Sequence, residues 1–276
     1  MKIVVFNGRH KLDLHHEIIY FDRFDLQNVD EIIEQIKLFK PDLIWEEEKN
    51  DGVSVFTDIY KQFPDIPKAW WLIDGHCNLI DHIVYAKQFD YVFCAQSWFV
   101  PIVQREVKAK VFYLPLCHTQ TMTGYQKMLQ TPVKKDIYFS FIGNIRSIHV
   151  ERREYISKFL AIYPNFFAVQ SDYEATLQYL RRSKATFNCS LNNDLNFRVW
   201  EALACDTVLI TDGVTDIGSI KGLRDRVVTY DKLFPDWTTD MPRDKDRVGF
   251  IKQGHTLTHR MLQMLDMVQL GEQYGY

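Results

Sequence analysis

The feature that most constrains the fold of this 276-residue chain is a regular alternation of short apolar runs with amphipathic segments. Residues 2–6 (KIVVF) are apolar and β-rich, whereas 30–39 place Ile32 and Ile36 one helical turn apart. Similar pairs follow one another through the first 116 residues. Near-continuous apolar strands separated by helices are typical of a parallel sheet covered on both faces, so we predict an α/β fold.

The alternation is interrupted once and then restarts. Residues 117–135 are polar and without sustained periodicity, which predicts a linker, and strand-like runs resume at 136–144. Residues 248–269 are predicted to form one long helix that closes the chain. We therefore expect two Rossmann-like α/β/α domains, 1–125 and 126–276, facing a cleft in which ligands bind at the carboxyl ends of strands.

Composition limits the location and the partners. No apolar run approaches the roughly 18 residues of a membrane span, and the first apolar stretch is short for a signal peptide, so we expect no stable membrane insertion. The five scattered cysteines contain no CxxC pair, which favours reduced thiols in a cytoplasmic protein. A net charge of -3 argues against a strongly basic nucleic-acid binder but leaves room for a local basic patch.

The strongest local signal is the segment 196–212, NFRVWEALACDTVLITD. A polar loop enters a helix whose free N–H groups and positive dipole end suit a phosphate. Arg198 adds a forked cation, and Glu201, one turn later, can accept two hydroxyl protons from a ribose. An ordinary amphipathic helix with a surface glutamate explains the same residue types equally well.

This segment resembles the C-terminal signature of GT-B glycosyltransferases, in the group similar to spore maturation protein CgeB and the family 4 enzymes. The stretches KPDLIW, KAWWLIDGH, FDYVFCAQSWFVP, KVFYLPL, DIYFSFIGNIRSIHVERREYI and GHTLTHRMLQML also resemble that group, in the correct order and over most of the chain. The matching signature positions are Asn196, Arg198, Trp200, Glu201, Ala202 and Ala204.

The resemblance implies a transferase that uses a nucleotide-activated sugar, most simply a UDP-sugar, bound by the C-terminal domain. It implies that Glu201 and Asn196 bind the donor and that Gly143 and Asn144 let the backbone approach its diphosphate. Arg146 or Arg198 would neutralise the departing diphosphate, so neither a metal nor a further cofactor is expected.

The turn Asp74-Gly75-His76 follows a predicted strand, where the resemblance places the acceptor. A carboxylate and an imidazole at this spacing can orient an acceptor hydroxyl or take its proton, so Asp74, His76 and Arg198 are the candidate catalytic residues. Alternatively, Asp74 caps the following helix.

Two departures from the family pattern leave alternatives open. Asn193 stands where family 4 enzymes often carry a second glutamate, which motivates a catalytically silent nucleotide- or glycan-binding module. Asp206 replaces a usual glycine and suggests a different helix ending.

The acceptor is expected to be a glycan, a small molecule or modified DNA, the last as in phage enzymes that glycosylate a hydroxymethylated base. Residues 1–125 argue against DNA because they carry 18 acidic and 13 basic residues. A groove would need a cluster among Lys108, Lys110, Lys134, Lys135, Arg152, Arg153, Arg181 and Arg182.

Other patterns are given less weight. His255 and His259 have zinc-ligand spacing but no obvious third ligand, and Asp244-Lys245-Asp246 matches a DxD motif in a charged loop. The run Glu46-Glu47-Glu48 is predicted to be solvated. Most of the 14% aromatic residues are assigned to cores. Five tryptophans are instead expected near the cleft, where some would line it and stack on a base or sugar and others would fill the two cores: Trp45, Trp70, Trp71, Trp98 and Trp200.

Overall fold

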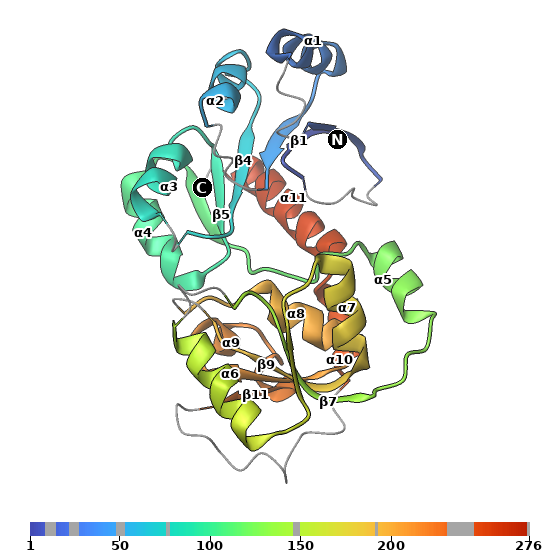
Figure 1. Cartoon of the computed structure of the whole chain (residues 1–276). Helices are drawn as coiled ribbons and strands as arrows, with labels where there is room; N and C mark the ends of the chain where they lie inside the picture. Colours follow the sequence, from blue (N-terminus) through green and yellow to red (C-terminus); the bar gives the residue numbers. More distant parts are fainter. Residues whose placement is uncertain are drawn as a thin grey trace. The chain divides into compact units, whose positions relative to one another are not determined.

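The computed structural model describes residues 1–8, 15–21, 28–47, 53–75, 78–145, 150–190, 193–230 and 246–274. The chain divides into two compact units (Figure 1). Unit 1 comprises Met1–Leu116 and Thr258–Tyr276, and unit 2 comprises Cys117–Leu257. Each unit contains one parallel sheet with helices between its strands, which confirms the predicted pair of Rossmann-like α/β domains.

Unit 1 has a six-stranded parallel sheet in the order β2-β1-β3-β4-β5-β6. Its central strands are buried along their whole length because helices cover both faces, as in doubly wound sheets. The strands are β1 (Lys2–Phe6), β2 (Glu17–Phe21), β3 (Leu43–Glu46), β4 (Lys68–Leu72), β5 (Tyr91–Cys94) and β6 (Lys110–Tyr113). The helices are α1 (Val29–Phe39), α2 (Val53–Lys61), α3 (Leu79–Ala86), α4 (Val100–Glu106) and α11 (Leu257–Tyr274).

Unit 2 has a five-stranded parallel sheet in the order β11-β10-β9-β7-β8. Its core is rich in phenylalanine, with Phe159 of α6 packed at 5.2 Å from the Phe139 ring and 4.7 Å from the Phe187 ring. The strands are β7 (Ile137–Ile142), β8 (Phe166–Val169), β9 (Ser183–Asn188), β10 (Val208–Asp212) and β11 (Val227–Tyr230). The helices are α5 (Met122–Leu129), α6 (Val150–Ile162), α7 (Tyr173–Arg182), α8 (Phe197–Ala204), α9 (Asp216–Ser219) and α10 (Arg247–Gly254).

The ends of the units differ from the predicted domains 1–125 and 126–276. The predicted linker contains α5, whose first turn is capped because the Thr121 hydroxyl accepts a hydrogen bond from the Gly124 amide at 3.2 Å. The predicted closing helix is two helices, α10 and α11, separated at 255–256, where Thr256 forms a β-bridge with His118. Most of α11 belongs to unit 1, where Arg260 donates to the Leu116 carbonyl at 3.1 Å. Helical periodicity does not indicate which sheet a helix covers, so this exchange could not be predicted.

The tryptophans expected to contact a ligand are mostly core residues. Trp45, Trp70 and Trp71 are at most 2% exposed in unit 1, and Trp200 is fully buried in unit 2. Trp98 is partly buried against the unit 1 core. The four buried rings therefore have no face open to a base or sugar. Trp45, Trp70 and Trp71 belong to strands that are covered on both faces, and Trp200 lies on the largely buried helix α8.

Glu46 at the end of β3 and Glu47 after it are not solvated, contrary to the prediction. Glu46 is fully buried and Glu47 is 3% exposed, while Glu48 lies outside the described residues. The Glu46 carboxylate accepts hydrogen bonds from the phenols of Tyr60 at 2.5 Å and Tyr85 at 2.7 Å. These two donors make its burial tolerable.

Candidate functional site

The carboxyl edge of the unit 2 sheet carries most of the predicted site residues. Strand β8, which follows β7 in the chain, lies next to β7 on one side, and the following strand β9 lies next to β7 on its other side. The order in which strands are added to the sheet therefore reverses between β7 and β9, and doubly wound sheets bind ligands at such a point. Gly143 and Asn144 follow β7, and Cys189 and Ser190 follow β9, so both loops meet this point.

Asn196 fixes the start of α8 at the same edge. Its side-chain oxygen accepts from the Arg198 amide at 3.1 Å, which is an N-cap, and its amide nitrogen donates to Asn188 at the end of β9 at 3.3 Å. Asn188 in turn donates to the Thr211 hydroxyl of β10 at 3.0 Å. The side chain predicted to bind the donor thus also ties the helix to two strands.

Arg198 and Glu201 form an ion pair on α8, with 2.8 Å between Nη1 and Oε2. Their side chains are only 16% and 8% exposed, so the pair lies in a weakly screened environment. The spacing i, i+3 places both groups on one face of the helix. The structure therefore brings together the predicted cation and the predicted ribose-binding carboxylate, whose contacts with a donor stay a prediction.

Arg152 also lies at this edge, although its sequence context indicated it only as one of the basic residues that a DNA groove could use. From the first turn of α6, its guanidinium donates to the carbonyl of Asn144 and to the carbonyl of Cys189, each at 2.8 Å. It also lies 5.7 Å from the centre of the Phe141 ring. Burial lowers the pKa of Arg152, and the nearby charge of Arg198 lowers it too, while Cys189 and Asp212 raise it.

The loops after β9 and β10 are joined by side-chain hydrogen bonds. Ser190 donates to the Asp212 carboxylate from its amide, at 3.0 Å, and from its hydroxyl. Asn193, in a left-handed conformation with φ of 61°, donates to the Thr215 hydroxyl at 2.9 Å and accepts from the Thr215 amide at 3.0 Å. The asparagine that replaces a family glutamate therefore connects two loops of the edge.

Asp206 does not change the ending of α8, contrary to the prediction. It adopts a left-handed conformation with φ of 51°, the one that glycine usually supplies at this position. The amides of Asp206 and Thr207 donate to the carbonyls of Leu203 at 3.1 Å and Ala202 at 2.9 Å, which is a complete Schellman motif. The Asp206 carboxylate pairs with Arg247 at 3.3 Å, an interaction that a glycine lacks.

The predicted acceptor residues belong to unit 1. Asp74 is exposed just after β4, and a side chain on Gly75 would come within 2.6 Å of the Phe99 ring, so this turn requires glycine. The alternative role of Asp74 as a helix cap is wrong, because the N-cap of α3 is Asn78. His76 lies outside the described residues, as does Arg146 of the predicted donor set.

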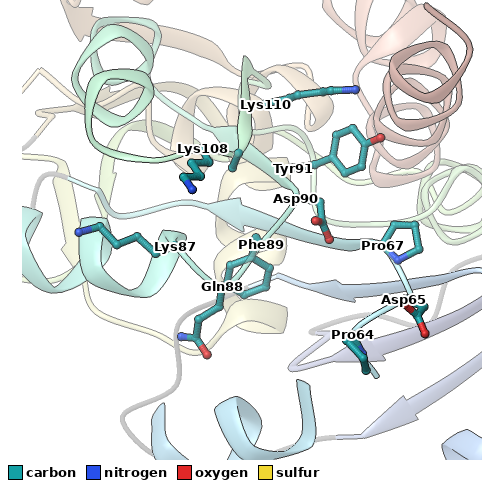
Figure 2. A pocket seen from close by; sticks show the side chains of 11 residues that line it. Pro64, Asp65, Pro67, Lys87, Gln88, Phe89, Asp90, Tyr91, Lys108 and Lys110 are labelled. Carbon is teal, nitrogen blue, oxygen red and sulfur yellow. The ribbon is translucent and has the colours of Figure 1, made fainter. Parts of the chain in front are cut away.

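A cavity of about 570 Å³ in unit 1 lies away from these residues (Figure 2). Its walls come from the loops that enter β4, β5 and β6, including Pro67, Asp90 and Lys108. It therefore opens at the amino ends of the strands, whereas Asp74 follows the carboxyl end of β4. Ligands of parallel sheets bind at the carboxyl ends, so this cavity is not the predicted site despite its size.

The minor motifs acquire structural roles. Asp246 is the N-cap of α10 and accepts from the Gly249 amide at 2.6 Å, while Asp244 and Lys245 lie outside the described residues. The His255 ring stacks on Trp200 at 5.0 Å. Within the described ranges, no three His, Cys, Asp or Glu side chains are grouped so that they could hold a metal ion.

Several basic residues considered for a DNA groove already have partners inside unit 2. Lys135 donates to the Cys205 carbonyl at 2.9 Å, and Arg182 forms a bidentate pair with Asp136 at 2.8 Å. Arg181 donates to the Thr131 carbonyl. These contacts leave fewer of the cations available for a phosphate backbone.

Comparison with known proteins identifies the fold. Residues 136–266, just under half of the chain, match the family described as glycosyl transferase-like, and no curated protein matches the sequence. HepE from Anabaena, solved with UDP-glucose, aligns with a TM-score of 0.60 and 11% identity over 98% of this chain and 99% of its own. No helix in the described part of the chain is long and apolar enough to cross a membrane.

Two further solved structures have the same fold. Sucrose-phosphate synthase from Thermosynechococcus elongatus aligns with a TM-score of 0.53 and 10% identity, over 98% of both chains. UDP-GlcNAc 2-epimerase from Methanocaldococcus jannaschii gives 0.53 and 11%, over 98% of this chain and 100% of its own. Identities this low establish the fold alone, which is GT-B with two Rossmann-like domains.

Proposed function

We propose that this protein is a glycosyltransferase that moves a sugar from a UDP-sugar to a hydroxyl acceptor without a metal ion, in the CgeB-like and family 4-like group. One observation carries the proposal. The glycosyl transferase-like match covers the carboxyl edge of unit 2, where Arg152, Arg198 and Glu201 are brought to a sheet switch point.

The proposed chemistry is electrostatic. Cleavage of a nucleotide-sugar leaves negative charge on the departing diphosphate, and fixed cations lower the energy of that charge as it develops. Arg198 is held by its ion pair with Glu201, so its guanidinium is already oriented. We assign the ribose hydroxyls to Glu201 and the diphosphate to the backbone at Gly143 and Asn144, with Asn196 and Arg146 completing the donor set.

The acceptor side is assigned to Asp74 and His76. Asp74 offers an exposed carboxylate after β4, where it can accept the proton of a hydroxyl group. A glycan or a small molecule fits this proposal better than modified DNA, because basic residues of unit 2 are engaged in intramolecular contacts.

A donor-binding test comes first. We expect UDP to raise the melting temperature of the protein and at least one UDP-sugar to be slowly hydrolysed or transferred in the presence of EDTA. If no UDP-, GDP- or TDP-sugar binds or turns over, the proposed function is wrong. Binding without turnover would support a silent module, and conversion of UDP-GlcNAc to its C2 epimer would support an epimerase, as one structural neighbour is.

Glu201→Gln tests the donor site at one residue. Loss of a hydrogen bond to a charged group costs about 1.5–3 kcal/mol, so the affinity for UDP should fall by roughly ten- to a hundredfold. Glu154→Gln on α6 is the matched control, since Glu154 is exposed. Unchanged UDP affinity in Glu201→Gln would remove Glu201 from the donor site.

A further inference from the structure

The pairing between β7 and β9 ends before the last residues of both strands. The two strands pair from Ile137 with Ser183 to Ser140 with Thr186, and no pairing continues to their last residues. Past the last pair, the two strands continue into different loops at the switch point. Parallel sheets bind ligands at such a switch point, so the relative position of the two loops matters for a ligand there.

Arg152 is hydrogen-bonded to the chain after both strands. Its Nη1 donates to the carbonyl of Asn144, after β7, and its Nη2 donates to the carbonyl of Cys189, after β9, both at 2.8 Å. The planar guanidinium has a fixed angle between these two donors, so the two carbonyls are held at a defined separation. We infer that Arg152 is a positioning residue that joins the loops after β7 and β9 into one rigid diphosphate-binding edge, an inference that rests on the proposed function.

The charge of Arg152 supports the same role. Its contacts are two neutral carbonyls and the Phe141 ring, and no carboxylate of the described residues lies within ion-pair distance of its guanidinium. Arg198, by contrast, is paired with Glu201. Arg152 therefore contributes positive charge that the described carboxylates do not neutralise at close range, and a diphosphate is the anion that the proposed donor brings.

The neighbouring residue provides a matched control. Arg153 follows Arg152 on α6 and is exposed. The same substitution at Arg153 therefore changes the net charge and the amino-acid composition of the helix as much as it does at Arg152. Lysine keeps the charge at position 152 but lacks the planar fork that bonds two carbonyls at once. Methionine removes both the charge and the fork.

The experiment measures binding of UDP and UMP by calorimetry, well below the melting temperature of each variant. For Arg152→Lys we expect UDP affinity to fall about tenfold or more, a larger fall for Arg152→Met, and a much smaller change for UMP, which lacks the second phosphate. Arg153→Lys and Arg153→Met should stay within about twofold of the wild type. Hydrogen exchange at 143–145 and 189–190 should accelerate in Arg152→Lys but not in Arg153→Lys.

The possible outcomes distinguish a failure of the proposed function from a failure of the inference about Arg152. Wild-type protein that binds neither UDP nor UMP overturns both the proposed function and this inference. Wild-type binding with equal affinity in Arg152→Lys overturns the inference alone. An equal fall for UDP and UMP, accompanied by a lower melting temperature, would mean that Arg152 only stabilises the fold and would also overturn it.

Discussion

The buried Glu46 cluster allows a quantitative test of how unit 1 tolerates a charge in its core. Glu46 is fully buried, and its Oε2 accepts from Tyr60 at 2.5 Å and from Tyr85 at 2.7 Å. The Asn7 side chain donates to the other oxygen at 3.4 Å. Burial raises the pKa of both tyrosines, and the charge of Glu46 raises it further, so both phenols stay protonated donors at neutral pH.

The expected energies follow from this geometry. Tyr85→Phe removes one hydrogen bond to a buried carboxylate and should cost about 1.5–3 kcal/mol of unfolding free energy. Tyr60→Phe combined with Tyr85→Phe removes both short donors and should approach the roughly 3–5 kcal/mol of a broken buried charge interaction. Adding Glu46→Met to that double variant removes the buried charge that the two phenols stabilised and should restore part of the loss.

Urea denaturation followed by tryptophan fluorescence measures these differences. Trp70 contacts Tyr85 at 5.2 Å between ring centres, so its emission reports on the cluster directly. Tyr138→Phe is the control, because Tyr138 is 51% exposed and should change stability by less than about 0.5 kcal/mol. A double variant as stable as the wild type, or a triple variant less stable than the double, would refute the reasoning.

Three further outcomes are expected. The unfolding free energy of Asp206→Ala should be about 1 kcal/mol lower than that of Asp206→Gly. Both variants lose the ion pair with Arg247, but only alanine is strained in the left-handed conformation of this position, so equal urea midpoints would contradict the expectation. Burial raises the pKa of Cys189 to about 11 and of Cys94 and Cys205 to about 12, so native protein at pH 8 should resist iodoacetamide while unfolded protein reacts, as peptide mass spectrometry would show. Because folding raises the pKa values of these thiols, their contribution to stability is complete below the unfolded pKa near 9 and is lost as pH rises through 11–12. Urea midpoints that do not fall above pH 9 would contradict this expectation.

The part of the candidate site that lies on α8 could be proposed from the sequence because its residues are side chains at helical spacing. Asn196, Arg198 and Glu201 were recognisable as residues, and the structure places all three at the edge of the unit 2 sheet. Arg152 could not be recognised in this way, since its partners are the backbone carbonyls of Asn144 and Cys189. A carbonyl group is present at every residue and leaves no mark in a sequence.

The fold was predictable to a similar extent, and its prediction failed for similar reasons. Apolar runs in alternation with helices predict parallel sheets, and both sheets are parallel. The same runs do not distinguish a buried tryptophan from one beside a ligand, and Trp45 and Trp70 proved to be core. Helix α5 was missed because its segment is mostly polar, with Tyr125 as its buried residue.

The assignment of α11 to unit 1 has a consequence for the order in which the protein is made. The ribosome synthesises β1 to β6 first, but the helix that completes this unit follows the whole of unit 2 in the chain. The buried residues Met261, Met264 and Leu265 of this helix therefore leave the ribosome only after all of unit 2. Unit 2, although second in the sequence, is the first that can finish folding during translation.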